Sequence, residues 1–188
     1  MRVKGFNIIL ILVVFSLLLV ATQADAGNEK RRGTAGALEL LIPVGSRGTA
    51  LGGNVAASIT GVEAMFWNPA GVAVSGASAE VMASHFEYIA GINVDYAAVA
   101  AKFGSVGTFG LNVKTLDFGD IPVTTEAEPE GTGQTFNPTF VTIGFTYSKQ
   151  LTDRIAFGTN IKLVTESIQN SNATGAAFDF GLQYIAGG

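Results

Sequence analysis

Residues 138–149 read PTFVTIGFTYSK and alternate between large apolar and small polar side chains. Val141, Ile143, Phe145 and Tyr147 fall on one face of an extended chain, because successive side chains of a strand point to opposite faces. The other face carries threonine, glycine and serine. The stretch therefore predicts a β-strand with one apolar face and one small, polar face.

This alternation recurs along the second half of the chain. It is clear in residues 108–114, 155–166 and 176–185, and less regular in 79–90 and 92–103, which gives six predicted strands. Strands of about 10 to 12 residues are longer than the five or six residues usual in a soluble β-sandwich. Their polar faces carry Gly, Thr, Ser, Asn and Gln with scattered charges, which is typical of a barrel lumen. We predict an all-β fold, part of an antiparallel transmembrane β-barrel, with a soluble sandwich as the alternative.

The predicted connections alternate in length. Gly104-Ser105 and residues 152–154 are tight, whereas residues 117–137 and 168–175 are longer and polar. Short turns at one end and long loops at the other are typical of outer-membrane barrels, whose short turns face the periplasm. Four tyrosines near predicted strand ends would suit an interfacial aromatic girdle: Tyr88, Tyr96, Tyr147 and Tyr184.

The first 26 residues have the organisation of a cleavable signal peptide. Arg2 and Lys4 precede an apolar run over residues 6–20, and Ala24-Asp25-Ala26 forms a small-residue exit, so cleavage is predicted after Ala26. A single membrane-anchoring helix is the alternative, but a spanning helix needs about 20 residues. Export to the bacterial outer membrane is the predicted localisation.

Composition restricts the partners. Removal of the leader would change the net charge from −4 to −5, with nine basic and fourteen acidic residues, which argues against nucleic acid. The basic triplet Lys30-Arg31-Arg32 is expected to be solvated. Cysteine is absent, so disulfides cannot stabilise this exported chain. Charged residues make up 14 % and apolar residues 48 %, without a helix-length apolar run after the leader. This composition suits a β-structure whose outer face is as apolar as its core.

Residues 37–75 are rich in glycine and alanine, lack the strand period, and predict short helices and turns. They hold two dense motifs, RGTALGG at residues 47–53 and AMFWNPAG at residues 64–71. The predicted organisation is a signal peptide over residues 1–26, a plug or hatch segment over 27–76, and a partial β-barrel over 77–188.

The sequence LIPVGSRGTALGG at residues 41–53, followed by FWNPAG at residues 66–71, resembles the N-terminal region of the PorV/PorQ family, which is related to the FadL-like long-chain fatty acid transporters of Gram-negative outer membranes. The resemblance covers roughly residues 37–186. It continues through Leu116-Asp117-Phe118-Gly119-Asp120-Ile121-Pro122, Gly131-Thr132-Gly133, Tyr147-Ser148-Lys149-Gln150-Leu151-Thr152-Asp153-Arg154, Lys162 and Phe178-Asp179-Phe180-Gly181.

The resemblance implies an outer-membrane barrel of more than six strands, entered by an N-terminal segment. In FadL-like transporters this segment plugs the lumen and contains an Asn-Pro-Ala sequence, matched by Asn68-Pro69-Ala70. Pro69 favours an extended Asn68, Gly71 permits a sharp exit, and Trp67 is expected to pack as an anchor. The candidate plug residues, structural and a possible gate, are Arg47, Gly48, Gly52, Gly53, Trp67, Asn68, Pro69 and Gly71.

No catalytic, metal or cofactor site is predicted. His85 is the only histidine, and Ser84 points to the opposite face of its strand, so His85 is expected to be a lumenal or interfacial residue. The glycines at 48, 52 and 53 lack the spacing of a phosphate or dinucleotide loop, and are expected to relieve crowding where the plug meets the barrel wall. The acidic residues Glu126, Glu128 and Glu130 indicate a solvated surface loop.

The predicted function is non-enzymatic transport of a hydrophobic small molecule across the outer membrane, with membrane lipid as a partner. The alternative is a shuttle or assembly role in type IX secretion, with secretion components or cargo as partners; a soluble secreted β-protein is less favoured. Members of the family continue well beyond six strands, and an open six-stranded sheet leaves unsatisfied edges in lipid. The chain is therefore expected to be part of a longer protein.

Overall fold

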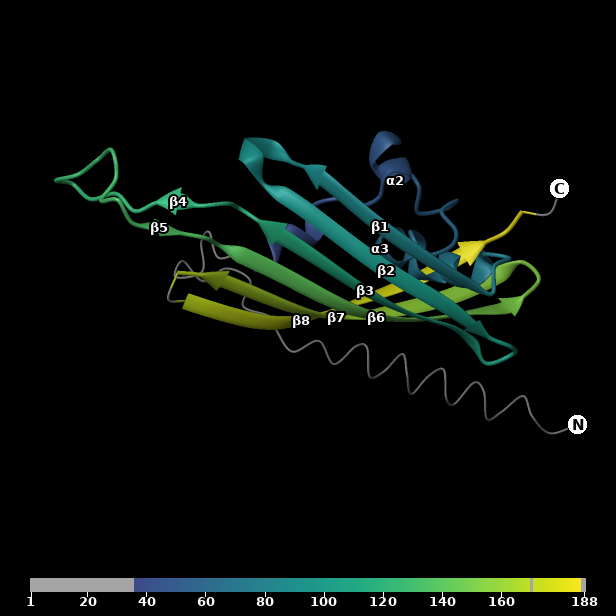
Figure 1. Cartoon of the computed structure of the whole chain (residues 1–188). Coiled ribbons are helices and arrows are strands. Elements are labelled where there is room, and N and C mark those ends of the chain that lie inside the picture. Colours follow the sequence, from purple (N-terminus) through teal and green to yellow (C-terminus); the bar gives the residue numbers. More distant parts are fainter. Residues whose placement is uncertain (1–35, 170, 187–188) are drawn as a thin grey trace, which may run out of the picture. The chain divides into compact units, whose positions relative to one another are not determined.

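The computed structural model describes residues 36–169 and 171–186. The predicted signal peptide and the first part of the predicted plug lie outside the described residues. Six long strands form one antiparallel sheet in the order β1-β2-β3-β6-β7-β8 (Figure 1). Their bounds are Ala79–Glu87, Asn93–Phe103, Gly107–Asp117, Thr139–Thr152, Ile155–Ile168 and Ser171–Tyr184. The prediction of an all-β fold with six strands is confirmed.

The segment before the sheet contains only short helices, as its composition predicts. They are η2 (Leu38–Leu41), α2 (Ser46–Ala50), α3 (Ala64–Trp67) and η3 (Pro69–Val74), and a further turn, η4 (Ile89–Gly91), joins β1 to β2. None of the helices within residues 36–169 and 171–186 has the length and apolar character needed to cross a membrane.

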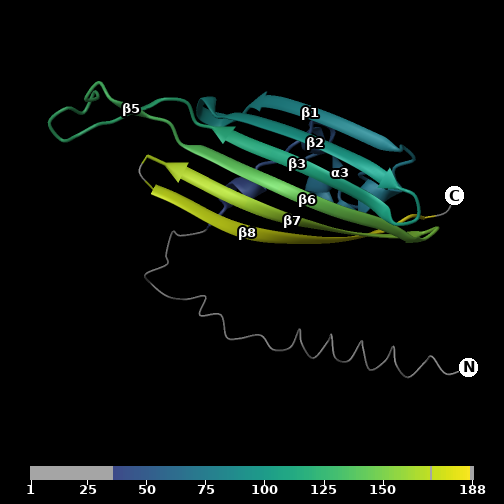
Figure 2. The ribbon, with the colours of Figure 1, turned by 60° about the horizontal axis from the view of Figure 1, so that its bottom comes forward.

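Two connections differ from the prediction or add to it. The stretch 168–175 is not a long polar loop, because β8 begins at Ser171 and pairs with β7 from Ile168 onward. Residues 171–175 are small or polar on both faces, so the sequence shows no alternation there. The long connection between β3 and β6 contains a short hairpin of β4 (Ile121–Pro122) and β5 (Thr135–Phe136), which extends beyond the end of the sheet (Figure 2).

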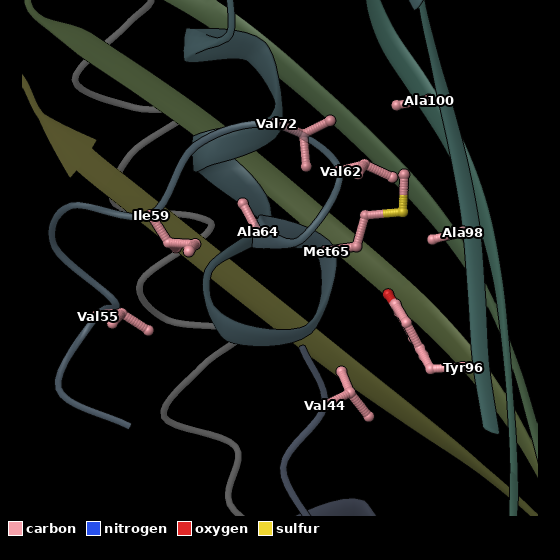
Figure 3. Packing of buried hydrophobic residues seen from close by; sticks show 10 residues of the cluster. All are labelled: Val44, Val55, Ile59, Val62, Ala64, Met65, Val72, Tyr96, Ala98 and Ala100. Atoms are coloured by element: carbon pink, nitrogen blue, oxygen red, sulfur yellow. The ribbon is translucent and has the colours of Figure 1, made fainter. Parts of the chain in front are cut away.

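The N-terminal segment, defined as residues 37–76, packs against one face of the sheet. We call that face the inner face and the opposite one the outer face. In Figure 2 the strands lie in front of this segment. An apolar cluster joins the segment to β2 (Figure 3), and it consists of Val44, Val55, Ile59, Val62, Ala64, Met65, Val72, Tyr96, Ala98 and Ala100.

Tyr96 belongs to this cluster and is 3 % exposed, so the prediction that it joins an outer aromatic girdle is wrong. Tyr96 is an even-numbered residue of β2, like the buried Val94, Ala98 and Ala100, so its side chain points to the inner face. Tyr184, by contrast, lies exposed at the end of β8.

The described strands form an open sheet, in which β1 and β8 are the edges and do not pair with each other.

Candidate functional site

Asn68 joins the N-terminal segment to the far edge of the sheet. Pro69 holds Asn68 in the extended conformation expected before proline, with φ −159° and ψ 101°. The Asn68 Nδ2 group donates hydrogen bonds to the carbonyl oxygens of Ala56 at 2.7 Å and Leu182 at 3.2 Å. Its Oδ1 accepts from the Ala70 N–H at 3.2 Å and so caps η3. One buried amide therefore ties two turns of the segment to β8.

The backbone that follows Asn68 rests on a row of small residues across three strands, which we call the seat: Ser148, Gly158 and Gly181. A Cβ atom on Gly158 would lie 2.2 Å from the carbonyl carbon of Pro69, and one on Gly181 would lie 2.0 Å from Asn68 Oδ1. The Ser148 hydroxyl accepts from the Ala73 N–H and donates to the Ala70 carbonyl, both at 3.1 Å. At Gly158 the close approach of the backbone requires glycine, whereas at Gly181 a Cβ would displace the Asn68 side chain from its hydrogen bonds.

Trp67 packs against other residues of the N-terminal segment and against the apolar cluster that the segment forms with β2. Its indole N–H donates to the carbonyl oxygen of Val44 at 3.2 Å, and its ring meets Phe66 edge to face at 5.0 Å between centroids. A Cβ on Gly48 would lie 2.3 Å from the indole nitrogen, and one on Gly53 would lie 3.2 Å from the ring. Trp67 is thus a packing residue of the segment, and Gly48 and Gly53 relieve crowding against its indole ring instead of against the sheet.

The other predicted plug residues have separate positions. Gly71 lies so close to the Ile59 backbone that an added Cβ would be 2.2 Å from the Ile59 carbonyl oxygen, and it also approaches the Gln183 side chain of β8. Gly52 adopts φ +64° in a turn where nothing lies close to it. Arg47 is exposed on α2 and is not brought to the sheet. Residues 67–71 therefore lie together where the N-terminal segment meets the sheet, and Arg47 and Gly52 lie outside this contact.

A buried group of charged residues lies beside this contact. The Lys114 ammonium, on β3, donates to the backbone carbonyl oxygens of Glu39 at 2.6 Å and Ile42 at 2.5 Å. Lys162, on β7, pairs with Asp179 at 2.6 Å. Both ammonium groups lie over the ring of Phe66, at 5.1 Å and 5.8 Å from its centroid. Sheet cations and a segment aromatic ring thus share one buried site.

Glu39 places a carboxyl group in the same region. Its side chain is buried, and burial raises the pKa of that carboxyl, an effect that the nearby Glu166 carboxylate reinforces. Glu166 in turn accepts a hydrogen bond from the Ala37 N–H at 3.0 Å. The start of the N-terminal segment is therefore attached to β3 through Lys114 and to β7 through Glu166.

The outer face has the opposite character. Two neighbouring cross-strand rows are apolar on all six strands. One row is Val81, Val99, Leu111, Phe145, Ile161 and Phe178, and the other is Ala83, Ala97, Val113, Ile143, Leu163 and Ala176. Val81 and Phe178 are 78 % and 62 % exposed. We call these rows, with Phe180, Leu182 and Tyr184 beyond them on β8, the apolar band.

Polar residues border the apolar band at the end of the sheet that carries the long β3–β6 connection. The outermost row there is polar on every strand: Glu87, Asn93, Asp117, Thr139, Ser167 and Asn172. In the next row, the His85 Nδ1 atom lies 2.7 Å from Asp95 Oδ1. His85 is on the outer face, so the lumenal alternative predicted for it is wrong.

Within the described residues, His, Asp and Glu side chains do not gather in threes that could hold a metal ion. Sequence reasoning missed Asp95 as the partner of His85, because the two residues come together only through the β1–β2 register.

The sheet residues that receive the N-terminal segment were also missed individually. Asn160 donates to the Met65 carbonyl at 3.2 Å, and Gln183 donates to the Ala57 and Ile59 carbonyls at 3.0 and 3.3 Å. The sequence places Asn160 and Gln183 on polar strand faces, which it predicts to line a lumen. The signal that could have found them is the combination of amides and glycines on one face, which leaves both space and donors for another backbone.

Comparisons of the chain with models of protein families, with curated proteins and with solved structures returned no match. The resemblance to PorV/PorQ and FadL-like proteins therefore stays a prediction from the motifs.

Proposed function

We propose that this chain forms part of the wall of an outer-membrane β-barrel, that the N-terminal segment is its plug, and that the assembly transports a small hydrophobic molecule. The observation that carries the proposal is the apolar band, which crosses all six strands on the face that the N-terminal segment leaves open. Lipid is the environment in which such a face is stable without a further protein layer.

The dimensions of the apolar band support this assignment. Six strands at a spacing of about 4.8 Å make it roughly 24 Å wide. On β8 the outer-face residues from Ala176 to Tyr184 extend for roughly 27 Å at about 3.4 Å per residue. The two rows that cross all six strands are two residues apart and span roughly 7 Å along each strand, and the band reaches its full length on β8. On β8 the length of the band is comparable with the apolar belt of about 25 Å around membrane barrels.

The inner face supports a plugged lumen. Its buried polar residues include Thr108, Asn112, Lys114, Thr146 and Asn160. A soluble sandwich would bury an apolar face and expose a polar one. Here the buried part of the inner face is largely polar on β3, β6 and β7 and at Gln183 of β8, and its cover is a single irregular segment, which is the arrangement expected of a lumen wall and its plug.

The hydrophobic nature of the transported molecule rests on the apolar cluster. Where the N-terminal segment meets β2, the contact consists of aliphatic side chains around Met65, Ala98 and Ala100. Parting of these surfaces would expose an apolar strip along the lumen, suited to a molecule with little hydrogen-bonding capacity. The edges β1 and β8 of the described sheet each need a pairing partner in lipid, because an open edge leaves backbone groups unsatisfied there.

Cysteine labelling tests the membrane assignment, because the natural chain has no cysteine. The variants Phe145→Cys, in the apolar band, and Thr139→Cys, in the polar row of the same strand, are placed in phospholipid vesicles and treated with a charged thiol reagent. Lipid should protect the cysteine at 145 and leave that at 139 reactive. Equal reactivity at the two positions would contradict the assignment.

Transport is tested separately with vesicles that contain the chain, by the influx of a hydrophobic fluorescent dye. A vesicle preparation with protected Phe145→Cys but no dye influx above that of protein-free vesicles would retain the membrane wall and reject the transport role. In cells, loss of secreted cargo with unchanged dye uptake on deletion of the gene would favour the type IX alternative.

A further inference from the structure

The N-terminal segment is held on its two sides by different kinds of contact. On β2 it is held by the apolar cluster. On β6, β7 and β8 it is held by close packing of η3, in which Ala70 and Ala73 are buried, and also by hydrogen bonds from Ser148, Asn160 and Gln183 to its backbone. Water can replace a hydrogen bond to a carbonyl group, but it cannot replace buried apolar contact. The contact with β6 to β8 contains the larger share of hydrogen bonds, so it is the contact that water can enter more readily.

Three side chains of the β6–β8 contact contain polar atoms that find no hydrogen-bond partner within the described residues. They are Thr146 Oγ1, Asn160 Oδ1 and Gln183 Oε1, one on each strand. Thr146 and Asn160 are 0 % exposed and face each other across the β6–β7 ladder. On the apolar side, Tyr96 Oη is one further such atom. In a face that stays covered, polar atoms without a partner only lower the stability. In a face that is hydrated in a second state, water satisfies these atoms.

The covalent connection agrees with opening on this side. The segment continues directly into β1 through residues 75–78, and Glu80 on β1 accepts from the Val62 N–H at 3.0 Å and from the Ser75 hydroxyl. The segment is thus tied to β1 by the chain itself and by Glu80. The seat under η3, by contrast, has no side chains at Gly158 and Gly181 that would interlock with it.

We propose that the inner face of β6 to β8 is the wall of a latent aqueous path, which opens when the N-terminal segment lifts from the seat while the apolar cluster stays closed. The path carries water and small polar solutes. Its lining offers donors and acceptors at Thr146, Asn160 and Gln183 and charges of both signs at Lys162 and Asp179. This inference rests on the proposed membrane wall, but it concerns a route distinct from the hydrophobic one along β2.

Three single-cysteine variants of the full chain in phosphatidylcholine vesicles test the proposal. Thr146→Cys reports the β6–β8 side, Ala98→Cys reports the apolar cluster, and Phe145→Cys reports the lipid-facing side. A small charged methanethiosulfonate should label Thr146→Cys at least about tenfold faster than Ala98→Cys, because only partial lifting of the segment is needed. Equal rates would overturn the proposal, as would labelling of Thr146→Cys by an uncharged reagent alone.

A second arm changes the seat in the Thr146→Cys background. Gly158→Ala should raise the labelling rate, because its Cβ would meet the Pro69 backbone. Gly175→Ala is the matched control, since nothing lies within 4 Å of the Cβ that it adds. An unchanged rate in Gly158→Ala, with the far-UV circular dichroism of a sheet retained, would count against the path. Rapid labelling of Phe145→Cys would contradict the proposed membrane wall. This result is separate from the two tests of the aqueous path.

Discussion

The two faces of this sheet reverse the arrangement of a soluble β-protein. The inner face is covered by protein, yet it carries Asn160, Thr146 and the Lys162–Asp179 ion pair. The outer face is open, yet it carries Phe180 at 75 % exposure and Leu182 at 69 %. The period of two is the same in either arrangement, so alternation alone identifies a strand but not the environment of each face. The environment follows from what covers each face.

The largest expected effect comes from placing a charge in the apolar band. Phe145→Lys should destabilise the protein in vesicles by about 2 to 4 kcal/mol, because a lysine near the middle of the bilayer loses its hydration. Thr139→Lys, in the polar row of the same strand, should cost at most about 1 kcal/mol. Urea titration of the folded fraction, followed by heat-modifiable gel mobility, measures both. Similar values for the two variants would contradict the placement of the apolar band in lipid.

The inner face is probed next through its ion pair. Lys162→Ala leaves the Asp179 carboxylate without its partner and should cost about 3 kcal/mol, the low end for a broken buried pair, because a third of the Asp179 side chain is exposed. Lys162→Met with Asp179→Asn should recover most of this loss, since no charge is then left uncompensated. If the double variant is as unstable as Lys162→Ala, the pair is not what the inner face requires at this site.

Much of this architecture could be predicted from the sequence, because large apolar and small polar side chains alternate along most of the strands. Val141 to Tyr147 against Thr142 to Ser148 is enough to define β6 and its faces. The start of β8 could not be predicted in this way. Residues 171–175 combine small and polar types on both faces, and only pairing with β7 makes them a strand.

The candidate site was predicted in part. Asn68-Pro69 and Gly71 mark a turn by local chemistry, and the structure places that turn at the centre of the contact with the sheet. Its receiving residues could not be predicted individually, because Gly158, Gly181 and Gln183 are adjacent to Asn68 only through long-range register and packing. The same limit hid the Lys114 contact with the Glu39 backbone, which spans 75 positions in the sequence.

Asn68 gives a test of how the segment is attached to the inner face. Asn68→Ala removes two donated bonds and one accepted bond, and should weaken docking by about 1 to 3 kcal/mol. Trp67, the only tryptophan, lies in the segment, so its fluorescence reports docking while circular dichroism reports the sheet. Asn68→Asp separates two roles. It keeps the acceptor for the Ala70 N–H but faces two carbonyl oxygens with a carboxylate, so it should be no better than Asn68→Ala. An Asn68→Asp variant that docks as well as the natural chain would reduce Asn68 to a helix cap.

The smallest expected effect concerns the acid group at the start of the segment. Because burial raises the pKa of Glu39 above 4.5, the folded protein binds a proton there more tightly than the unfolded chain does. Stability from this group is therefore full below 4.5 and falls as the pH rises through the higher, folded pKa.

Glu39→Gln should remove that fall, because an amide keeps the shape of the protonated carboxyl without titrating. The groups around it, Glu166 and Lys114, are unchanged in the variant, and the Lys114 bond goes to the backbone carbonyl of Glu39, which glutamine retains. Urea midpoints of the Trp67 fluorescence change, measured below pH 4.5 and at neutral pH, should converge for Glu39→Gln and separate for the natural chain. Parallel pH profiles would mean that the inner face tolerates a charged Glu39, and that the polar character of this face extends to the start of the N-terminal segment.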